Sequence, residues 1–193
     1  MPENNQGSKS PWIFIPTLYF AQGLPYAIIN NFSVVMFKSL GISNELIGYT
    51  TLLSLPWTIK PLWGPLVDST GSKRNWLVYM QLLLSMMFVL SGFLLNFSFF
   101  FTAIIIVFTL SAFISATHDI ATDGYYLHAL DAGSQAFFTG IRSTFFRLAM
   151  VFGSGILVTI AGTLGDNQRN TEYGWPLELI LAAAIFILLF ISH

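Results

Sequence analysis

Six long apolar segments, separated by short polar connections, constrain the fold of this chain more than any other feature of its sequence. Each segment is long enough to cross a bilayer as an α-helix. Hydrophobic residues make up 54% of the chain and charged residues only 9%, which excludes an ordinary soluble domain. We therefore expect an all-α, polytopic membrane protein with six transmembrane helices. Their expected limits are Trp12–Leu40, Glu45–Val67, Asn75–Phe97, Ser98–Leu127, Gln135–Leu164 and Trp175–Ile191.

The residues before the first apolar segment are polar. They lack the basic start and the small-residue cleavage site of a signal peptide, so residues 1–11 are predicted to be an N-terminal leader. Residues 12–193 are then expected to form the transmembrane bundle. The net charge of −1 and the scattered charges give no basic surface for nucleic acid, and cysteine is absent. We expect no metal ion and no other cofactor.

Lysine and arginine in the short connections predict the orientation of the bundle. With the N-terminus inside, the inner side carries Lys9, Lys73 and Arg74, and the outer side carries Lys38 and Arg169. Cytoplasmic connections hold the excess of basic residues in membrane proteins. We therefore expect a cytoplasmic N-terminus.

One lysine lies inside an apolar segment. Lys60 belongs to the second expected span, which is interrupted by Pro56, Pro61 and Pro65. A charged side chain at bilayer depth is costly, so Lys60 is expected to face a partner or a water-filled cavity rather than lipid. The alternative is that its long side chain reaches back to the inner membrane surface.

Counting along the helices predicts which charges share a depth. Lys60 lies about 11 residues before the centre of the connection near Gly71, which is about 16 Å along a helix. Asp119 and Arg142 lie about 11 residues on either side of the next inner connection. The spacing predicts that Lys60, Asp119 and Arg142 occupy one layer near the inner face.

Two aspartates in the fourth segment are candidates for proton coupling. Asp119 and Asp123 are four residues apart, so a helix places them on one face and one turn from each other. Like charges at this spacing disfavour joint ionisation, with Arg142 as a neighbouring cation. We expect one of the two to titrate during transport. The alternative is a charge network that latches the helices together.

The first and fifth segments carry further candidates for solute contact. Gln22, Tyr26 and Asn30 recur every four residues on one helical face, a pattern that suits either a polar ligand or hydrogen bonding between helices. Arg147 lies deep in the fifth segment, where it predicts either solute contact or a structural ion pair.

The connection after the second segment resembles a signature of the major facilitator superfamily. In GPLVDSTGSKR, the matching positions are Gly64, Asp68, Gly71, Lys73 and Arg74. The resemblance implies the N-terminal six-helix bundle of a major facilitator fold. It also implies that these residues form an inner gate, governed by Asp68 with Arg74.

Three other stretches are similar to one family within this superfamily. They are FAQGLPYAI (20–28), PWTIKPLWGPLVD (56–68) and THDIATDGYYLHAL (117–130), which resemble the AmpG-type muropeptide permeases and the related acetyl-CoA transporters. The resemblance implies a proton-linked symporter in the bacterial inner membrane. Its solute would be an anhydro-muropeptide or another polar anionic molecule, with Gln22, Tyr26, Lys60 and Arg147 in contact with it.

The resemblance also implies that half of the transporter lies elsewhere, because such proteins rock two six-helix bundles against each other. We expect the chain to be the N-terminal half of a longer protein, truncated at its C-terminus. A second copy of the chain is the alternative partner, with the chain then a structural half-transporter subunit.

A different class of function stays open from the residues alone. Asp119 and Asp123 on one helical face, with His118 or His128, could hold a metal ion in an intramembrane enzyme. The interpretation preferred here leaves both histidines without a role.

Overall fold

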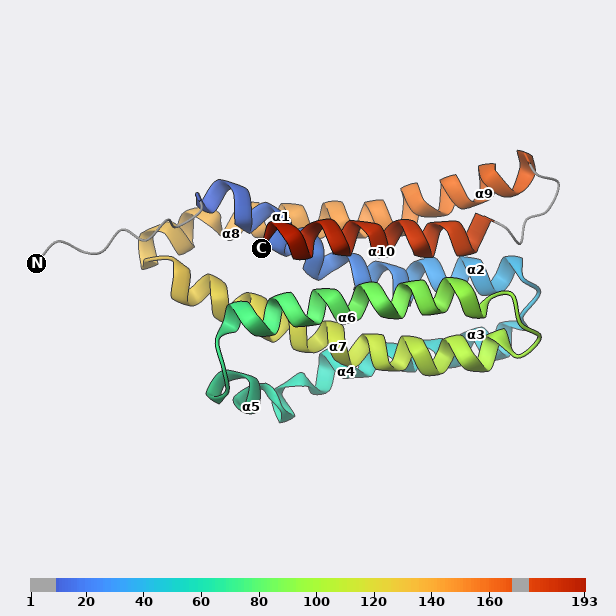
Figure 1. Ribbon diagram of the computed structural model, residues 1–193, viewed down its shortest axis with the longest axis horizontal. Helices are drawn as coiled ribbons and strands as arrows, with labels where there is room; N and C mark the ends of the chain where they lie inside the picture. Colours follow the sequence, from blue (N-terminus) through green and yellow to red (C-terminus); the bar gives the residue numbers. More distant parts are fainter. Residues whose placement is uncertain (1–9, 168–173) are drawn as a thin grey trace, which may run out of the picture.

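The computed structural model describes residues 10–167 and 174–193. It is a bundle of long helices that run side by side (Figure 1). The predicted leader lies mostly outside the described residues, as does Arg169. The long helices are α1 (Pro11–Ala27), α2 (Ser33–Ser39), α6 (Lys73–Leu94), α7 (Phe100–Ala129), α8 (Ala132–Val151), α9 (Leu157–Asn167) and α10 (Gly174–Ser192).

Single π-helical turns join two pairs of these helices into continuous segments. Ile28–Phe32 connects α1 to α2, and Phe152–Ile156 connects α8 to α9. In the described part of the chain, five helical segments are then long and apolar enough to cross a membrane. They are Pro11–Ser39, Lys73–Leu94, Phe100–Ala129, Ala132–Leu164 and Gly174–Ser192, which confirm five of the expected spans and an all-helical membrane protein.

The second expected span is not a continuous helix. It consists of α3 (Asn44–Tyr49), a 3-10 turn (Thr50–Ser54), α4 (Leu55–Ile59), a second 3-10 turn (Lys60–Leu62) and α5 (Gly64–Ser69). Three prolines within ten residues, Pro56, Pro61 and Pro65, explain the breaks. Each removes a backbone donor and crowds the preceding turn, so no long hydrogen-bonded ladder forms.

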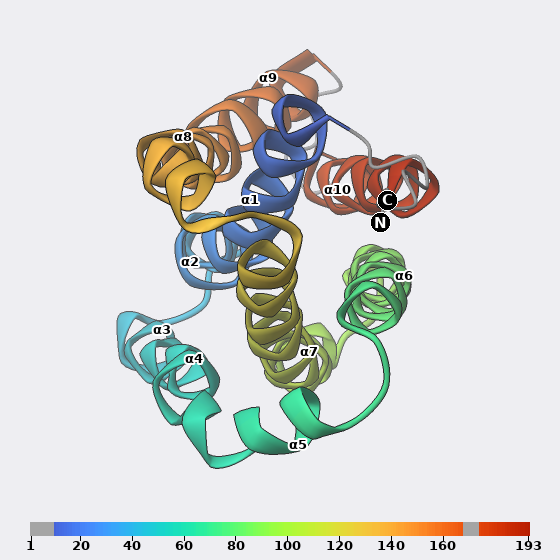
Figure 2. The same cartoon turned by 90° about the vertical axis from the view of Figure 1, so that its left-hand side faces the viewer.

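The broken segment packs on the outside of the bundle. The pieces that follow α3 contact α7, and the end-on view places α4 and α5 beside that helix, with α3 farther out (Figure 2). On the other side, α6 packs between α7 and α10, while α1 packs against both α7 and α8. The helix α7 therefore lies between the broken segment and α1, which brings residues of all three together.

A close approach between α1 and α8 fixes how these two helices meet. A Cβ atom on Gly23 would lie 2.7 Å from the carbonyl oxygen of Phe146 and 3.0 Å from Cβ of Ala149. One on Gly153 would lie 2.6 Å from Cβ of Ala27. Small residues at such positions let helix backbones come together in a membrane.

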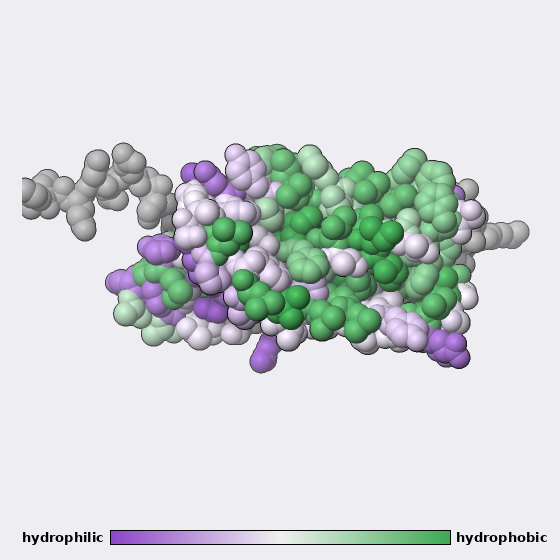
Figure 3. Space-filling model, turned by 90° about the horizontal axis from the view of Figure 1, so that it is seen from below, coloured by the Kyte–Doolittle hydropathy of each residue, from purple (hydrophilic) through white to green (hydrophobic). Residues whose placement is uncertain are grey.

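The surface of the bundle is apolar over most of its length. From below, hydrophobic residues cover the central region and hydrophilic ones gather at the end where α5 and the start of α6 lie (Figure 3). Large apolar side chains are strongly exposed, including Leu62 and Leu66 of the broken segment. A water-soluble monomer rarely exposes so much contiguous apolar surface, so the exposed face suits lipid.

Candidate functional site

A buried aspartate stands at the centre of the predicted charge layer. The side chain of Asp119, on α7, is only 9% exposed and accepts hydrogen bonds from Lys60 Nζ and from Gln22 Nε2. These donors come from the broken segment and from α1. The side chain of Lys60 is 30% exposed, so its charge is less buried than that of its partner. One carboxylate thus ties three elements together.

The second aspartate has partners of its own. Asp123 lies one turn further along α7, and its Oδ1 accepts from Tyr19 Oη at 3.0 Å. The guanidinium of Arg142 lies 3.4 Å from the same oxygen. That guanidinium also lies over the rings of Tyr19 and Tyr126, 4.8 and 4.9 Å from their centroids. The two ion pairs, Lys60 with Asp119 and Arg142 with Asp123, are therefore neighbours on one face of α7.

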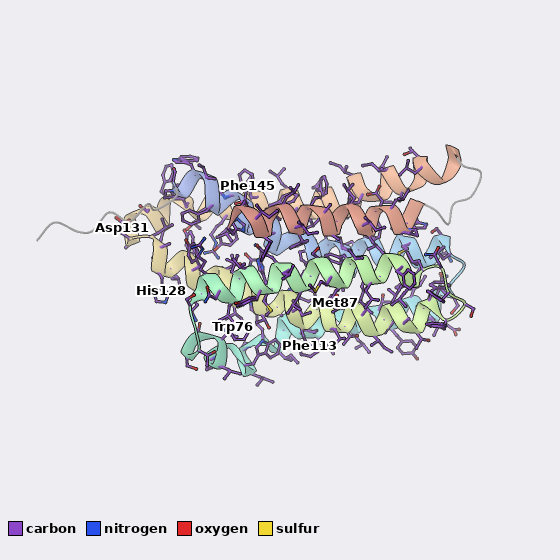
Figure 4. The ribbon with its side chains drawn as sticks, viewed as in Figure 1. Trp76, Met87, Phe113, His128, Asp131 and Phe145 are labelled. Atoms are coloured by element: carbon purple, nitrogen blue, oxygen red, sulfur yellow. The ribbon has the colours of Figure 1, made fainter. Side chains whose placement is uncertain are left out.

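Aromatic contacts hold the Lys60 turn against α7. The indole N–H of Trp63 donates to Thr117 Oγ1 at 3.2 Å, and its ring centroid lies 5.5 Å from that of Phe113, whose side chain faces the broken segment in Figure 4. On the other side of Lys60, Trp57 meets Tyr26 of α1 edge to face at 4.9 Å. The backbone around Lys60 is anchored by side chains where helical hydrogen bonds are missing.

The five residues expected to contact a solute do not line a single cavity. Tyr26 and Asn30 line a cavity of about 430 Å³ together with hydroxyl and amide side chains of α3 and the turn that follows it. Gln22 and Arg147 line a second, of about 220 Å³. Lys60 lines a third, of about 400 Å³, which also borders both Asp68 and Asp123.

The residues of the expected inner gate lie around the turn between α5 and α6. Lys73 Nζ donates to Asp68 Oδ1 at 2.7 Å and to the carbonyl of Val67 at 2.9 Å. Gly71 has a φ of +65°, a conformation that allows the tight reversal. Gly64, the first residue of α5, lies beside Ile120 of α7.

Asp68 and Arg74, which were expected to govern this gate, have different partners in the structure. Asp68 bonds to Lys73, whereas Nε of Arg74 donates to the carbonyl of His193 at 2.9 Å. The reason is helical geometry, because consecutive residues at the start of α6 point about 100° apart. Lys73 faces back across the turn, and Arg74 faces α10.

The candidate metal ligands of the alternative reading do not converge. Within the described ranges, no group of three or more His, Asp or Glu side chains is arranged to hold a metal ion. His128 lies in the last turn of α7, near the end of the bundle marked by Asp131 (Figure 4). His118 is buried and turned toward α6, where Nε2 of Gln81 lies 3.2 Å from its ring nitrogen Nε2.

A comparison with protein families identifies the kind of chain that carries this site. The family model described as the BT1 family matches residues 21–190, which include every residue of both ion pairs. The chain belongs to the BT1 family.

Relatives of this BT1-family chain come from bacteria and yeast. It is 29% identical over 181 residues to an uncharacterised protein of Haemophilus influenzae, covering 90% of this chain and 41% of that protein. It is 28% identical over 180 residues to the anhydromuropeptide permease of Escherichia coli, covering 88% and 34%. An uncharacterised protein of Schizosaccharomyces pombe is 28% identical over 159 residues, covering 73% and 30%. The chain spans less than half the length of each, and the expected likeness to AmpG-type permeases is confirmed.

Sequence reasoning missed a buried polar chain in this BT1-family bundle. The amide of Gln81, on α6, lies 2.9 Å from Nδ1 of His193 as well as 3.2 Å from His118, and Nε2 of His193 lies 2.8 Å from Thr17 Oγ1. These contacts link α1, α6, α7 and α10. A glutamine inside an otherwise apolar segment was the available signal, since a buried amide needs hydrogen-bond partners. Glu178, buried in α10, was missed in the same way.

Proposed function

We propose that this chain forms one bundle of a secondary active transporter. It would move an anhydro-muropeptide-like or other polar anionic organic solute across the bacterial inner membrane, together with a proton. The buried contact of Lys60 and Gln22 with Asp119 carries this proposal. Ionisable groups inside a membrane bundle typically mark a solute or proton pathway. The likeness to a protein named anhydromuropeptide permease supports the solute class.

The proposed mechanism is alternating access around the charge cluster. The solute would be held between this bundle and a second one, supplied by the rest of a longer protein or by another copy of the chain. Gln22, Tyr26, Asn30, Lys60 and Arg147 would contribute its polar contacts. Because they line three separate cavities in this structure, a solute touching all of them would extend along the bundle face.

The two aspartates suit a proton carrier. Protonation of Asp119 would remove the charge that attracts Lys60, while Gln22 could remain hydrogen-bonded to the neutral acid. Asp123 would keep Arg142 in place one turn away. Proton binding would thereby change which groups face the solute, and that coupling is what a symporter requires.

The broken segment is proposed to cross the membrane as well, which would complete the six spans of a major facilitator bundle. It begins after α2, at the end of the bundle opposite the turn to α6, and runs along α7 toward that turn (Figure 1). With the N-terminus cytoplasmic, the turn that contains Gly71, Lys73 and Arg74 would face the cytoplasm. The contact of Lys73 with Asp68 would then act at the inner gate.

Uptake by the full-length protein tests the proposed function. Cells that express it should accumulate a radiolabelled anhydro-muramoyl tripeptide, and Lys60→Ala should abolish accumulation when uptake is divided by the amount of protein in the membrane. Lys38→Ala is the matched control, because Lys38 lies at the far end of α2 and its ammonium group bonds only to Asn44 among the groups described. Normal uptake by Lys60→Ala would refute the assignment.

Proton coupling needs a separate measurement. Asp119→Asn and Asp123→Asn should be compared with the wild type for uptake across a range of pH. At least one variant should lose the pH dependence. If both retain it unchanged, neither carboxylate is the coupling group.

A further inference from the structure

The charges beside α7 do not balance. The cluster contains three cations, Lys60, Arg142 and Arg147, and two carboxylates, Asp119 and Asp123. Lys60 is bound to Asp119, and Arg142 is bound to Asp123. Arg147 forms no ion pair with any side chain in the described ranges. One positive charge is left over, and it belongs to Arg147.

This arginine opens into a cavity. Together with Tyr19, Gln22, Arg142, Ser143 and Phe146 it lines a cavity of about 220 Å³ between α1 and α8. The four residues from α8 occupy positions i, i+1, i+4 and i+5, which form one helical face. Phe146 and Ala149 of α8 are pressed against Gly23 of α1, so the cavity lies beside the closest approach of the two helices.

The polar groups of this cavity have a definite chemical character. Its two guanidinium groups are the donors, whereas the hydroxyl of Ser143 already donates to the carbonyl of Thr139 at 3.1 Å, and the carboxylates beside them are engaged. An unpaired cation in a membrane bundle costs free energy unless water solvates it or an anion pairs with it. A guanidinium offers a planar fork of N–H groups that matches a carboxylate or a phosphate.

We propose that this cavity binds the acidic end group of the transported solute, with Arg147 as its main partner and Arg142 as a second donor. The inference rests on the proposed function and adds a division of labour to it. Lys60 is bound to Asp119 and can contact the solute only after that carboxylate takes up a proton, whereas the excess charge at Arg147 can recognise the solute before the proton step. Solute pockets of drug-like size usually measure 300 Å³ or more, so roughly 220 Å³ accommodates an end group and not the whole molecule.

A matched pair of probes tests the proposal on the purified full-length protein in lipid nanodiscs. The probes are 1,6-anhydro-N-acetylmuramic acid, which carries one carboxylate, and its uncharged amide of nearly equal size. The wild type should bind the acid more tightly than the amide. Arg147→Gln should weaken binding of the acid by about tenfold to a hundredfold, as for the loss of a charged hydrogen bond, and leave the amide unchanged. Arg147→Lys keeps the charge but not the planar fork, so its affinity for the acid should lie between those of the wild type and Arg147→Gln.

A second probe separates this proposal from the choice of solute. Inorganic phosphate should raise the melting temperature of the wild type and of the control Lys38→Gln, and should not raise that of Arg147→Gln. If phosphate behaves in this way while no anhydro-muropeptide is taken up, the anion site stands and the solute class is wrong. Equal behaviour of Arg147→Gln and the wild type toward both the acid and phosphate would overturn the proposal.

Discussion

The ion pair between Lys60 and Asp119 predicts an asymmetric response to mutation. Lys60→Met leaves a carboxylate that is 9% exposed with Gln22 as its remaining donor. Breaking a buried pair in this way costs about 3–5 kcal/mol, because an uncompensated charge stays buried. Asp119→Asn instead leaves an ammonium group that is 30% exposed and can reach water. Its cost should be nearer about 1–2 kcal/mol, the lower part of the range for a lost buried partner.

A double-mutant cycle isolates the interaction itself. The double variant Lys60→Met/Asp119→Asn buries no lone charge, so it should be less destabilised than Lys60→Met, with a coupling of about 2–3 kcal/mol. Asp68→Asn is the control, because Asp68 is 61% exposed in its pair with Lys73 and its loss should cost less than about 1 kcal/mol.

The free energy of unfolding can be followed by tryptophan fluorescence as the protein, purified in detergent, is titrated with sodium dodecyl sulfate. Two results would contradict the reasoning. In the first, Lys60→Met would lower the free energy of unfolding no more than Asp119→Asn does. In the second, the double variant would lower it by the sum of the two single effects. Either would mean that the carboxylate is not confined as the structure describes.

Two further predictions concern the packing and capping of α8. Gly23→Ala should destabilise the protein by about 1–3 kcal/mol, because the new methyl group would lie 2.7 Å from the carbonyl oxygen of Phe146 and would force α1 and α8 apart. Gly140→Ala is the control, because Gly140 has open space around it, and it should be neutral or slightly stabilising in the same titration. Equal effects of the two substitutions would contradict the close approach. Asp131 caps α8, and its hydrogen bonds from Ser134 lower the pKa of its carboxyl. A lowered pKa contributes stability above the ordinary aspartate range that is lost as pH falls through the lowered value. Thermal unfolding between pH 6 and about pH 3 should therefore show a smaller loss for Asp131→Asn, which keeps a capping oxygen but cannot titrate, than for the wild type; identical pH profiles would remove the cap from the explanation.

The positions of the long helices were predictable because apolar length alone decides them in a membrane. Proline was harder to interpret. Pro16 and Pro25, nine residues apart, lie within an intact α1, whereas Pro56, Pro61 and Pro65 break the second segment. Isolated prolines lose one hydrogen bond each, which neighbouring helices can compensate, but closely spaced ones leave only about one helical turn between them.

Counting along helices could indicate that Lys60 and Asp119 lie at one depth, but it could not assign partners. Which carboxylate Arg142 meets depends on how far α8 is rotated about its own axis, and that rotation is determined by the contact of Gly23 with α8. The sequence of α1 or of α8 taken alone therefore does not determine this rotation. The contacts of Gln81 with His118 and His193 were hidden for the same reason, since they join residues far apart in the chain.

The 3-10 turn at Lys60–Leu62 has a consequence for how this charge can move. Pro61 has no backbone N–H, so the carbonyl of Trp57 lacks the donor that an unbroken helix would supply there. The contact from Trp63 N to the carbonyl of Lys60, at 3.2 Å, closes a short 3-10 turn and does not continue an α-helical ladder. Swinging the ammonium group away from Asp119 would therefore disturb little secondary structure. The lysine lies at a break in the helix, so its ion pair and the contacts of Trp57 and Trp63, rather than the stiffness of a helix, set the energy needed to release it.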